Sequence, residues 1–206
     1  YQTKTPEDAD SYEVLRKFGI ERAETDWILR IDADERSHPS LNARLQSLIE
    51  SEAADVVMVP RQTFVGTVWI DHGRRWWPDR SPVAFRKDAI EVSDEIHRSL
   101  RIRPEADIVE LPATADSALR HYSYESPRHL FRKRRRWAII EGRTTEKQID
   151  WMLYSSAREF LESYVVDRGF QNGLYGLIAS CSDSLYHLLV IYYSIRHDVS
   201  EKCLPR

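Results

Sequence analysis

The chain has 206 residues, of which 42% are hydrophobic, and its formal net charge is −3. This length suits one domain, or one domain with a small appendage, and the apolar content is sufficient for a sizeable core. The small net charge excludes a general polyanion binder or a membrane cation. Two cysteines are too few for a disulfide framework or a structural zinc site, and they favour a reducing compartment.

The first part of the chain predicts an α/β fold. A polar loop over residues 1–10 precedes a short helix that we expect to end at Gly19. Residues 26–31 form an apolar run of strand length, and residues 55–60 form a β-branched run that indicates the next strand. Between them, the apolar positions of residues 39–49 recur at helical spacing. Strand, helix and strand in this order indicate a βαβ unit and a sheet that is at least partly parallel.

The rest of the chain predicts short strands and then helices. Strand-like pieces cover residues 83–87 and 107–112, and residues 117–124 form the last predicted strand. Ser126 and Pro127 are typical of a helix start. The last predicted helix, residues 174–196, has a one-sided apolar stripe, which indicates packing or an interfacial position rather than a membrane span. The three predicted helices cover residues 127–142, 155–168 and 174–196.

A cluster of acids follows the first predicted strand directly. Asp32 and Asp34 are two residues apart, so in extended backbone both side chains point the same way. Ligands of open α/β sheets bind beyond the carboxyl ends of the strands, and carboxylates suit Mg²⁺ or Mn²⁺ held together with substrate phosphates. The acids therefore predict a metal site, and the alternative is a solvated acidic turn.

Four sequence blocks, in the same order, resemble one enzyme family. The run DWILRIDADE (residues 26–35) resembles the Asp-x-Asp signature of family 2 glycosyltransferases with the GT-A fold. WWPD (residues 76–79) followed by FRK (residues 85–87) is similar to an acceptor-side segment of the lipopolysaccharide-core and cell-surface glucosyltransferase subgroup. RHYSYES (residues 120–126) and the C-terminal block at residues 160–176 resemble further segments of that subgroup.

The resemblance implies a partial GT-A-like mixed or parallel sheet with flanking helices. Residues 1–125 would form the metal and acceptor half of the catalytic domain, and residues 126–206 a helical C-terminal extension. The family begins with a strand, an Asn-Glu loop and a second strand that together bind the nucleoside. Because the chain starts at Tyr1 without them, we expect that about 80 residues of such a domain are missing at the front.

The resemblance also implies transfer of a sugar from a nucleotide diphosphate sugar, with inversion at the anomeric carbon, to a glycan or lipid-linked acceptor. Mn²⁺ or Mg²⁺ would bridge the two phosphates. By matching position, Asp34 would be the metal ligand and Asp32 would lie near the ribose or the metal. His121 is expected to complete the coordination, and a histidine ligand would favour Mn²⁺.

An inverting transfer needs a base for the acceptor hydroxyl. The family pattern often places His-Glu here, and His97 matches the histidine, but Arg98 stands at the position of the glutamate. Glu95 or Asp94 is therefore the preferred base, and Asp79 is a third candidate. The residues expected to bind substrate are Arg30, Glu35, Trp76, Trp77, His97 and Lys133. The tryptophans would stack on sugar rings, and their alternative role is to fill the core.

Five consecutive basic residues, 132–136, lie in the predicted helix that starts at Pro127. Such a run covers every side of a helix, so some of these side chains must point inward or toward a partner. Lys133 on one face is placed to meet pyrophosphate, and other members are placed to touch an anionic membrane. Negative net charge argues against specific nucleic-acid binding. Together with the family resemblance, these observations suggest a cytoplasmic protein with peripheral contact at the inner face of the cell membrane.

Two other functions remain open at this point. The chain would be a non-catalytic module that binds a glycan or a partner if the nucleoside half is truly absent. It would be a metal-dependent phosphoesterase if Asp32, Asp34 and His121 hold a metal that hydrolyses a simple phosphate ester.

Overall fold

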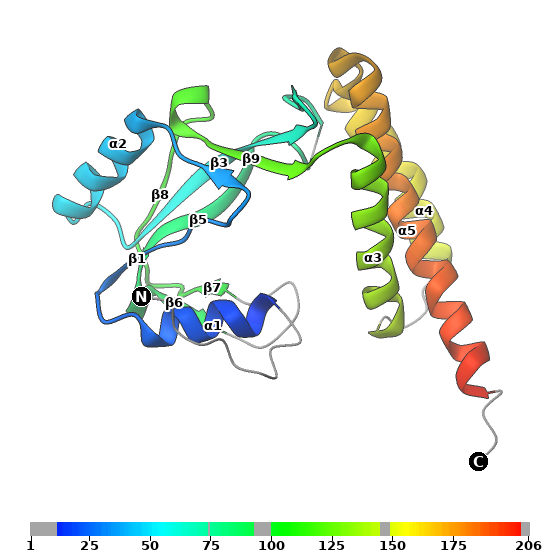
Figure 1. The fold of residues 1–206 in the computed structure, drawn as a ribbon, viewed down its shortest axis with the longest axis horizontal. Coiled ribbons are helices and arrows are strands. Elements are labelled where there is room, and N and C mark those ends of the chain that lie inside the picture. Colours follow the sequence, from blue (N-terminus) through cyan, green and yellow to red (C-terminus); the bar gives the residue numbers. More distant parts are fainter. Residues whose placement is uncertain (1–11, 74, 93–99, 145–148, 203–206) are drawn as a thin grey trace. The chain divides into compact units, whose positions relative to one another are not determined.

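The computed structural model describes residues 12–73, 75–92, 100–144 and 149–202. Its helices are α1 (Tyr12–Arg22), α2 (Pro39–Glu50), α3 (Pro127–Thr144), α4 (Ile149–Leu161) and α5 (Gly173–Lys202) (Figure 1). Its strands are β1 (Trp27–Leu29), β2 (Glu35–Arg36), β3 (Val56–Val65), β4 (Val68–Trp69), β5 (Asp79–Arg86), β6 (Ile90–Val92), β7 (Leu100–Ile102), β8 (Ile108–Glu110) and β9 (Leu119–Tyr124).

The strands confirm the predicted α/β class with a mixed sheet. Seven strands form one sheet in which the order β1-β5-β3-β9-β2 is extended by β4 and β8, both paired with β3. β1 runs antiparallel to β5, whereas β3 runs parallel to β8 with Val56 opposite Ile108. β6 and β7 form a separate antiparallel pair. The parallel pair in this sheet is β3 with β8. The two strands of the predicted βαβ unit, β1 and β3, are not neighbours, because β5 lies between them.

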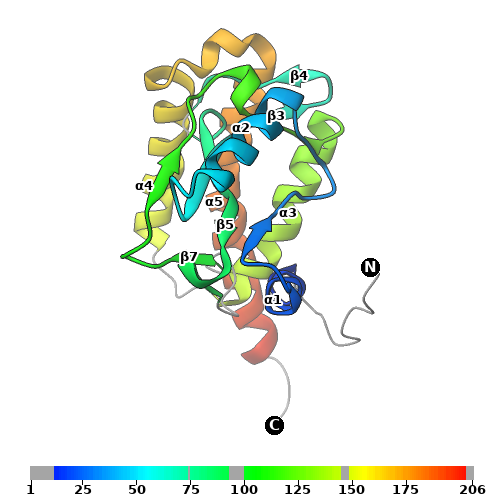
Figure 2. The same ribbon diagram turned by 90° about the vertical axis from the view of Figure 1, so that its left-hand side faces the viewer.

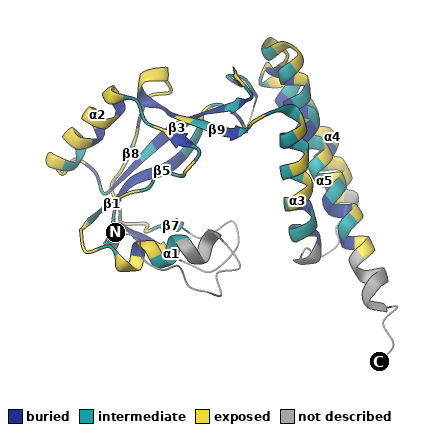
Figure 3. Cartoon of the chain, viewed as in Figure 1, coloured by how far each residue is buried: buried dark blue, intermediate teal, exposed yellow. Residues whose placement is uncertain are grey.

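The chain divides into two compact units, and residues 1–60 and 80–119 make up the first. Leu41 and Leu45 of α2 pack against Val57 and Val59 of β3 on one face of the sheet. Ile20 of α1 belongs to a second cluster with Val56 and Phe85. Successive residues at the start of β3 thus enter different clusters, which explains why residues 56–59 are continuously apolar rather than alternating. Figure 3 shows this buried centre on β3 and β5.

The first two helices test the predicted boundaries. α2 begins at Pro39 as predicted, and a ring nitrogen of His38 caps it by accepting a hydrogen bond from the backbone N–H of Ser40 at 3.3 Å. The expectation that Gly19 ends the first helix is wrong, because α1 continues to Arg22. A glycine inside a helix destabilises it by only about 1 kcal/mol relative to alanine. Burial of the adjacent Ile20 outweighs that cost.

The second unit comprises residues 61–79 and 120–206. Its helices α3, α4 and α5 lie side by side, with α5 in contact with both others (Figure 2). One cluster joins Trp76 to Leu130 of α3 and Ala179 of α5. Another joins Met152 of α4 to Val190 of α5. The helical unit therefore has its own core.

Two of the three predicted C-terminal helices agree closely with the structure, and the third does not. α3 and α5 include the predicted ranges 127–142 and 174–196. The helix predicted at residues 155–168 begins earlier, at Ile149, and its α-helical part ends at Leu161 in a π-helical turn, Glu162–Val166. Met152 explains the early start, because this buried residue anchors the first turn of α4 against α5.

The apolar stripe of α5 is largely solvent-exposed. Leu174 is 68% exposed, and Leu185, Leu188 and Tyr192 are exposed as well, while Asp183 on another face is buried. Residues 169–196 are long and apolar enough to cross a membrane by length and composition alone, with 33% of that window buried. Ile178 and Leu189 of the stripe are half-buried and pack against the unit's buried clusters, whereas its exposed members do not contribute to this packing. The expected interfacial position stays a prediction, as does the division of function at residues 125 and 126.

Candidate functional site

The acidic segment forms a tight turn directly after β1. The backbone N–H of Glu35 donates to the carbonyl oxygen of Asp32 at 2.9 Å, and the Glu35 carboxylate accepts from the backbone N–H of Asp32 at 3.0 Å. Glu35 is 4% exposed. Its side chain therefore holds the turn from inside, while the carboxylates of Asp32 and Asp34 remain partly accessible on the outside.

A positive charge from another element stands beside this turn. The guanidinium of Arg16 on α1 lies 3.2 Å from the carboxylate of Asp32. Both side chains keep about a third of their surface exposed, so water screens the pair and it contributes little stability. The contact nevertheless offsets the repulsion between Asp32 and Asp34, two like charges that are two residues apart.

Arg30, at the end of β1, is fixed against β5. Its backbone N–H donates to the carbonyl oxygen of Val83 at 2.8 Å, and its guanidinium donates to the hydroxyl of Ser81. Arg30, Asp32, Asp34 and Glu35 thus all belong to the first unit and lie along one short segment. Their predicted roles toward metal and substrate stay predictions.

The second unit contains a cavity of about 250 Å³ that we call the arginine cavity. Three of the predicted site residues line it together, namely Trp76, Asp79 and His121. The remaining lining residues are Arg61, Thr63, Arg75, Tyr124 and Arg134. A sequence block around residue 76 and another around residue 121 are therefore brought to one place by the fold of this unit.

Each arginine of the cavity has a carboxylate partner. Arg61 binds Asp79, which also lines the cavity. Arg134 binds Asp183 of α5, whose side chain has no exposed surface. The third pair joins Nε of Arg75 to Glu159 of α4 at 2.6 Å.

Burial and charge shift the titration of the Arg134 pair. Burial alone would lower the pKa of Arg134, but Asp183 and the nearby tyrosines outweigh it and raise the pKa. Burial raises the pKa of Asp183, and the charge of Arg134 partly offsets that rise. The guanidinium is thus a permanent positive charge in the wall of the cavity.

The two neighbouring tryptophans have different surroundings. Trp76 is 2% exposed, and its indole Nε1 donates to Asp183 at 2.7 Å. Trp77 is half-buried and meets the ring of Trp69 edge-on, with ring centres 5.0 Å apart. Trp76 therefore combines the predicted alternative role of a core residue with a place in the cavity wall, and stacking of either ring on a sugar stays a prediction.

The basic run of α3 divides between interior and surface, as predicted for five consecutive charges. Lys133 donates to the hydroxyl of Ser123 at 2.9 Å and lies 5.2 Å from the ring centre of Tyr124. Arg134 points into the unit toward Asp183, whereas Arg132, Arg135 and Arg136 are exposed. The buried position of Arg134 was not predicted individually, although the unbroken run of charges was the signal that some member must turn inward.

Three predicted residues, Asp94, Glu95 and His97, lie outside the described residues. Within the described ranges, no three histidine, cysteine or acidic side chains gather closely enough to hold a metal ion. Asp32 and Asp34 belong to the first unit and His121 to the second, so the proposal that these three share one metal stays a prediction.

A comparison with known proteins adds a family to this geometry. Residues 12–108 match the family model described as Glycosyl transferase family 2. The matched range includes α1, the acidic turn, α2 and the strands from β1 to β7, and it ends before His121 and the helices α3, α4 and α5. No curated protein and no solved structure matches the chain. The match supports the family resemblance and a glycosyltransferase-type function.

Proposed function

We propose that this protein is a metal-dependent inverting glycosyltransferase that moves a sugar from a nucleotide diphosphate sugar to a glycan or lipid-linked acceptor of the cell envelope. The observation that carries the proposal is the match of residues 12–108 to glycosyl transferase family 2, with the Asp32–Asp34 turn at the end of β1 inside the matched range. The lipopolysaccharide-core or cell-surface subgroup is part of the proposal and rests on the four sequence blocks.

The donor atoms of the turn suit Mn²⁺ or Mg²⁺. Such an ion is commonly held by one or two carboxylates together with substrate phosphates and water, and Asp32 and Asp34 offer two partly accessible carboxylates. The bound ion would neutralise charge on the departing nucleoside diphosphate. Glu35 positions the turn through the backbone N–H of Asp32, and a bound ion would compete with the guanidinium of Arg16 for the Asp32 carboxylate.

The arginine cavity is proposed as part of the acceptor side. Asp79 lies in its wall beside His121, and Arg61 orients the Asp79 carboxylate. A carboxylate with a fixed orientation is able to take the proton of an acceptor hydroxyl placed within hydrogen-bond reach. Among the three base candidates, Asp79 is the one whose surroundings are described, while Asp94 and Glu95 remain candidates by sequence.

Peripheral contact with an anionic membrane is a further part of the proposal. Arg128, Arg132 and Arg136 are exposed and recur every four residues along one side of α3. The stripe of α5 adds exposed leucines, among them Leu174 and Leu188. Basic and apolar side chains exposed on one helical unit are typical of binding at a lipid surface, which suits a lipid-linked acceptor at the cytoplasmic face.

The experiment that tests the function measures sugar transfer and donor hydrolysis with a panel of nucleotide diphosphate sugars, with Mn²⁺, with Mg²⁺ and with EDTA. We expect turnover that EDTA abolishes and that Asp34→Asn reduces roughly 100-fold, because even residues that only orient a metal ligand typically contribute about 10–100-fold. The matched control is Asp26→Asn, an exposed aspartate just before β1, which should keep full activity.

Other results would favour the alternatives. Phosphate release from simple esters without sugar transfer would support the phosphoesterase. Glycan binding without any turnover would support the non-catalytic module. Turnover of a nucleotide sugar that persists unchanged in EDTA would show that the metal assignment is wrong.

A further inference from the structure

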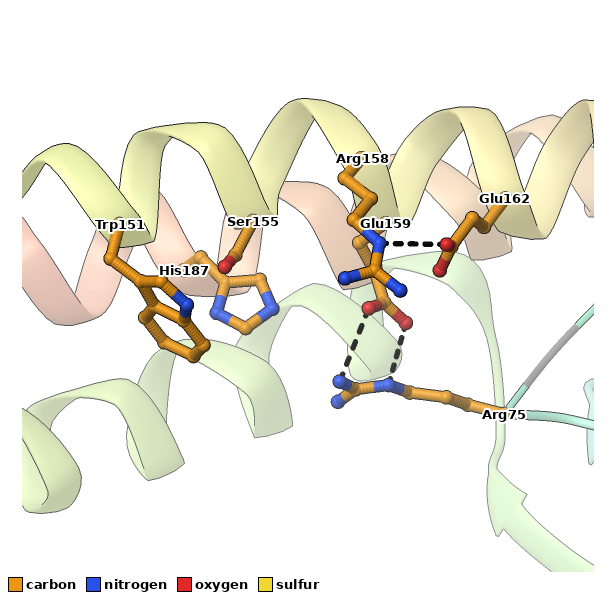
Figure 4. Close-up of a pocket in the computed structure, with 7 residues that line it drawn as sticks. All are labelled: Arg75, Trp151, Ser155, Arg158, Glu159, Glu162 and His187. Carbon is orange, nitrogen blue, oxygen red and sulfur yellow. Dashed lines mark hydrogen bonds and ion pairs between the residues drawn. The ribbon is translucent and has the colours of Figure 1, made fainter.

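One face of α4 is polar where a packed helix normally carries apolar residues. The side chains of this face are four, three, one and three residues apart, which is the spacing of one side of a helix. They are Trp151, Ser155, Arg158 and Glu159 of α4 and Glu162 of the turn that follows it. This face does not simply meet solvent. Together with Arg75 and His187 it encloses a second cavity of about 220 Å³, the α4–α5 cavity, which lies entirely within the second unit (Figure 4).

The charges around the α4–α5 cavity cancel in pairs. Arg75 holds Glu159 with two contacts, at 2.6 Å from Nε and at 3.2 Å from a terminal nitrogen. Arg158, near the end of α4, holds Glu162, the first residue of the π-helical turn that follows, at 2.7 Å. Figure 4 shows both pairs beside the cavity. Because two positive charges face two negative charges, the lining offers no excess charge for an anion such as a phosphate.

His187 of α5 contributes a neutral polar atom. Burial lowers the pKa of its imidazole, and the charge of Arg75 lowers it further. The Nε2 atom is buried and, within the described part of the chain, has no hydrogen-bond partner. A buried polar atom without a partner is costly, and a ligand hydroxyl satisfies a neutral imidazole nitrogen whether that nitrogen accepts or donates.

Trp151 gives the cavity an accessible aromatic surface. The side chain is 59% exposed although it is large and apolar. Figure 4 shows its indole next to the imidazole of His187 and on the same side of α4 as Ser155. An exposed aromatic face beside paired charges and hydroxyl-binding groups matches a pyranose ring, whose C–H face packs on an aromatic ring while its hydroxyls bind polar groups.

The volume sets the size of the occupant. Cavities for drug-sized ligands typically measure roughly 300–1,000 Å³, and this one measures about 220 Å³. It is therefore too small for a nucleotide diphosphate sugar and suits a single monosaccharide ring. The volume of the cavity and the balanced charge of its lining therefore lead to the same conclusion. Both argue against a nucleotide, and both are compatible with a neutral sugar.

We propose that the α4–α5 cavity is a subsite for one neutral hexose ring of the glycan acceptor. Trp151 packs against the face of the ring, Glu159 and His187 bind its hydroxyls, and Arg75 and Arg158 hold the two glutamates in place. The identification of this sugar as part of the acceptor rests on the proposed function, whereas binding of the sugar itself does not.

The test is direct binding of neutral monosaccharides to the 206-residue chain. Glucose, galactose, mannose and N-acetylglucosamine are titrated while saturation-transfer NMR and tryptophan fluorescence are recorded, and glycerol serves as a polyol without a ring face. We expect saturable binding of at least one sugar and none of glycerol. Removing the aromatic face in Trp151→Ala should weaken this binding roughly tenfold.

Further variants separate a binding role from a structural one. Tyr154→Ala is the matched control, since Tyr154 is an exposed aromatic residue on α4 that does not line the cavity, and it should keep binding within about twofold. His187→Phe preserves the ring shape but removes both nitrogens, and Ser155→Leu fills the cavity from its wall. Both should weaken sugar binding while the circular dichroism spectrum stays native.

Two kinds of result would overturn the subsite. One is the absence of saturable binding for all four sugars. The other is equal binding loss in Trp151→Ala and Tyr154→Ala, or binding that survives in Ser155→Leu. A cavity that only accommodates water between α4 and α5 would give the first result.

Failure of the subsite and failure of the proposed function can be told apart. Hydrolysis of the nucleotide sugar by water requires no acceptor sugar, so it reports the donor reaction alone. If hydrolysis occurs but the four sugars do not bind, the subsite is wrong and the transferase stands. If the sugars bind with the expected variant pattern but no nucleotide sugar is ever turned over, the transferase is wrong and the subsite belongs to a glycan-binding module.

Discussion

The indole Nε1 of Trp76 donates a hydrogen bond of 2.7 Å to Oδ2 of Asp183, a carboxylate on α5 that has no exposed surface. Arg134 of α3 binds the other oxygen of the same carboxylate. Three elements, α3, α5 and the segment before β5, are thereby joined at one buried charge. Trp76, which the sequence suggested for stacking on a sugar ring, is therefore part of the framework that shapes the arginine cavity.

We predict that Arg134→Met strongly destabilises the protein. The variant leaves the Asp183 carboxylate buried without its counter-charge, which costs about 3–5 kcal/mol in comparable cases. Urea unfolding followed by circular dichroism measures the loss. Arg135→Met, an exposed arginine that donates to Tyr193, is the control and should leave the unfolding midpoint nearly unchanged.

The double variant Arg134→Met with Asp183→Leu tests the same pair from the other side. Removing both charges abolishes the unpaired carboxylate, so stability should recover by a large part of what the single variant lost. A double variant as unstable as the single one would show that the hydrogen bond from Trp76 to Asp183 or the packing of Arg134, and not the charge pair, is what matters.

Alanine at two glycines should have opposite effects on stability. A Cβ atom on Gly176 of α5 would lie 1.8 Å from the carbonyl oxygen of Gly169, so this backbone would have to move. We expect Gly176→Ala to lower the free energy of unfolding by about 1–3 kcal/mol. Gly19 of α1 has open space around the Cβ position, and Gly19→Ala should raise it by about 0.5–1 kcal/mol. Thermal unfolding of both variants decides the signs.

His187 should make stability depend on pH in mildly acidic solution. Burial lowers the pKa of the folded imidazole below the value of about 6.5 in an unfolded chain. The unfolded state therefore binds more protons below that pH, and the free energy of unfolding falls as the pH decreases through the folded pKa. Unfolding by urea at several values between about pH 5 and about pH 8 measures this slope.

The variant His187→Phe removes the titrating group from this site. We expect a smaller loss of stability on acidification than in the unaltered protein. An identical pH dependence in the two proteins would mean that other groups, and not the buried imidazole, are responsible for the acid sensitivity.

The helical unit should bind anionic vesicles through α3. In co-sedimentation with vesicles of neutral and acidic lipids, we expect binding that increases with the acidic fraction and decreases with salt. Replacing Arg128, Arg132 and Arg136 by glutamate should abolish it. The control places three glutamates at exposed positions of α2, Asn42, Arg44 and Gln46, where no loss is expected. Concentration-dependent self-association without vesicle binding would instead assign the exposed stripe of α5 to a second copy of the chain.

Features with a local signal were predictable from the sequence. Pro39 and Pro127 marked the starts of α2 and α3 correctly, because proline is tolerated only in the first helical turn. The acidic turn after β1 was likewise visible as an apolar run that ends in charges. The prediction failed where burial determines the helix boundaries. Burial of Ile20 extends α1 beyond Gly19, and burial of Met152 makes α4 begin earlier than predicted.

Relationships between distant residues had no local signal. The insertion of β5 between β1 and β3 depends on strand pairing across the whole first unit. The partners Arg16 and Asp32 come from different elements, as do Arg134 and Asp183, which are 49 residues apart. The α4–α5 cavity was not predicted for the same reason. In the sequence, its polar α4 face looks like an ordinary solvated surface, and only the fold shows that α5 and Arg75 lie against it.

Arg75 lines both the arginine cavity and the α4–α5 cavity. A single guanidinium, anchored on Glu159, thus forms a shared wall between two chambers of the helical unit. A ligand in one cavity that moves the Arg75 side chain would change the affinity of the other cavity for its ligand. Thermodynamic reciprocity then requires that the second ligand change the affinity for the first by the same factor.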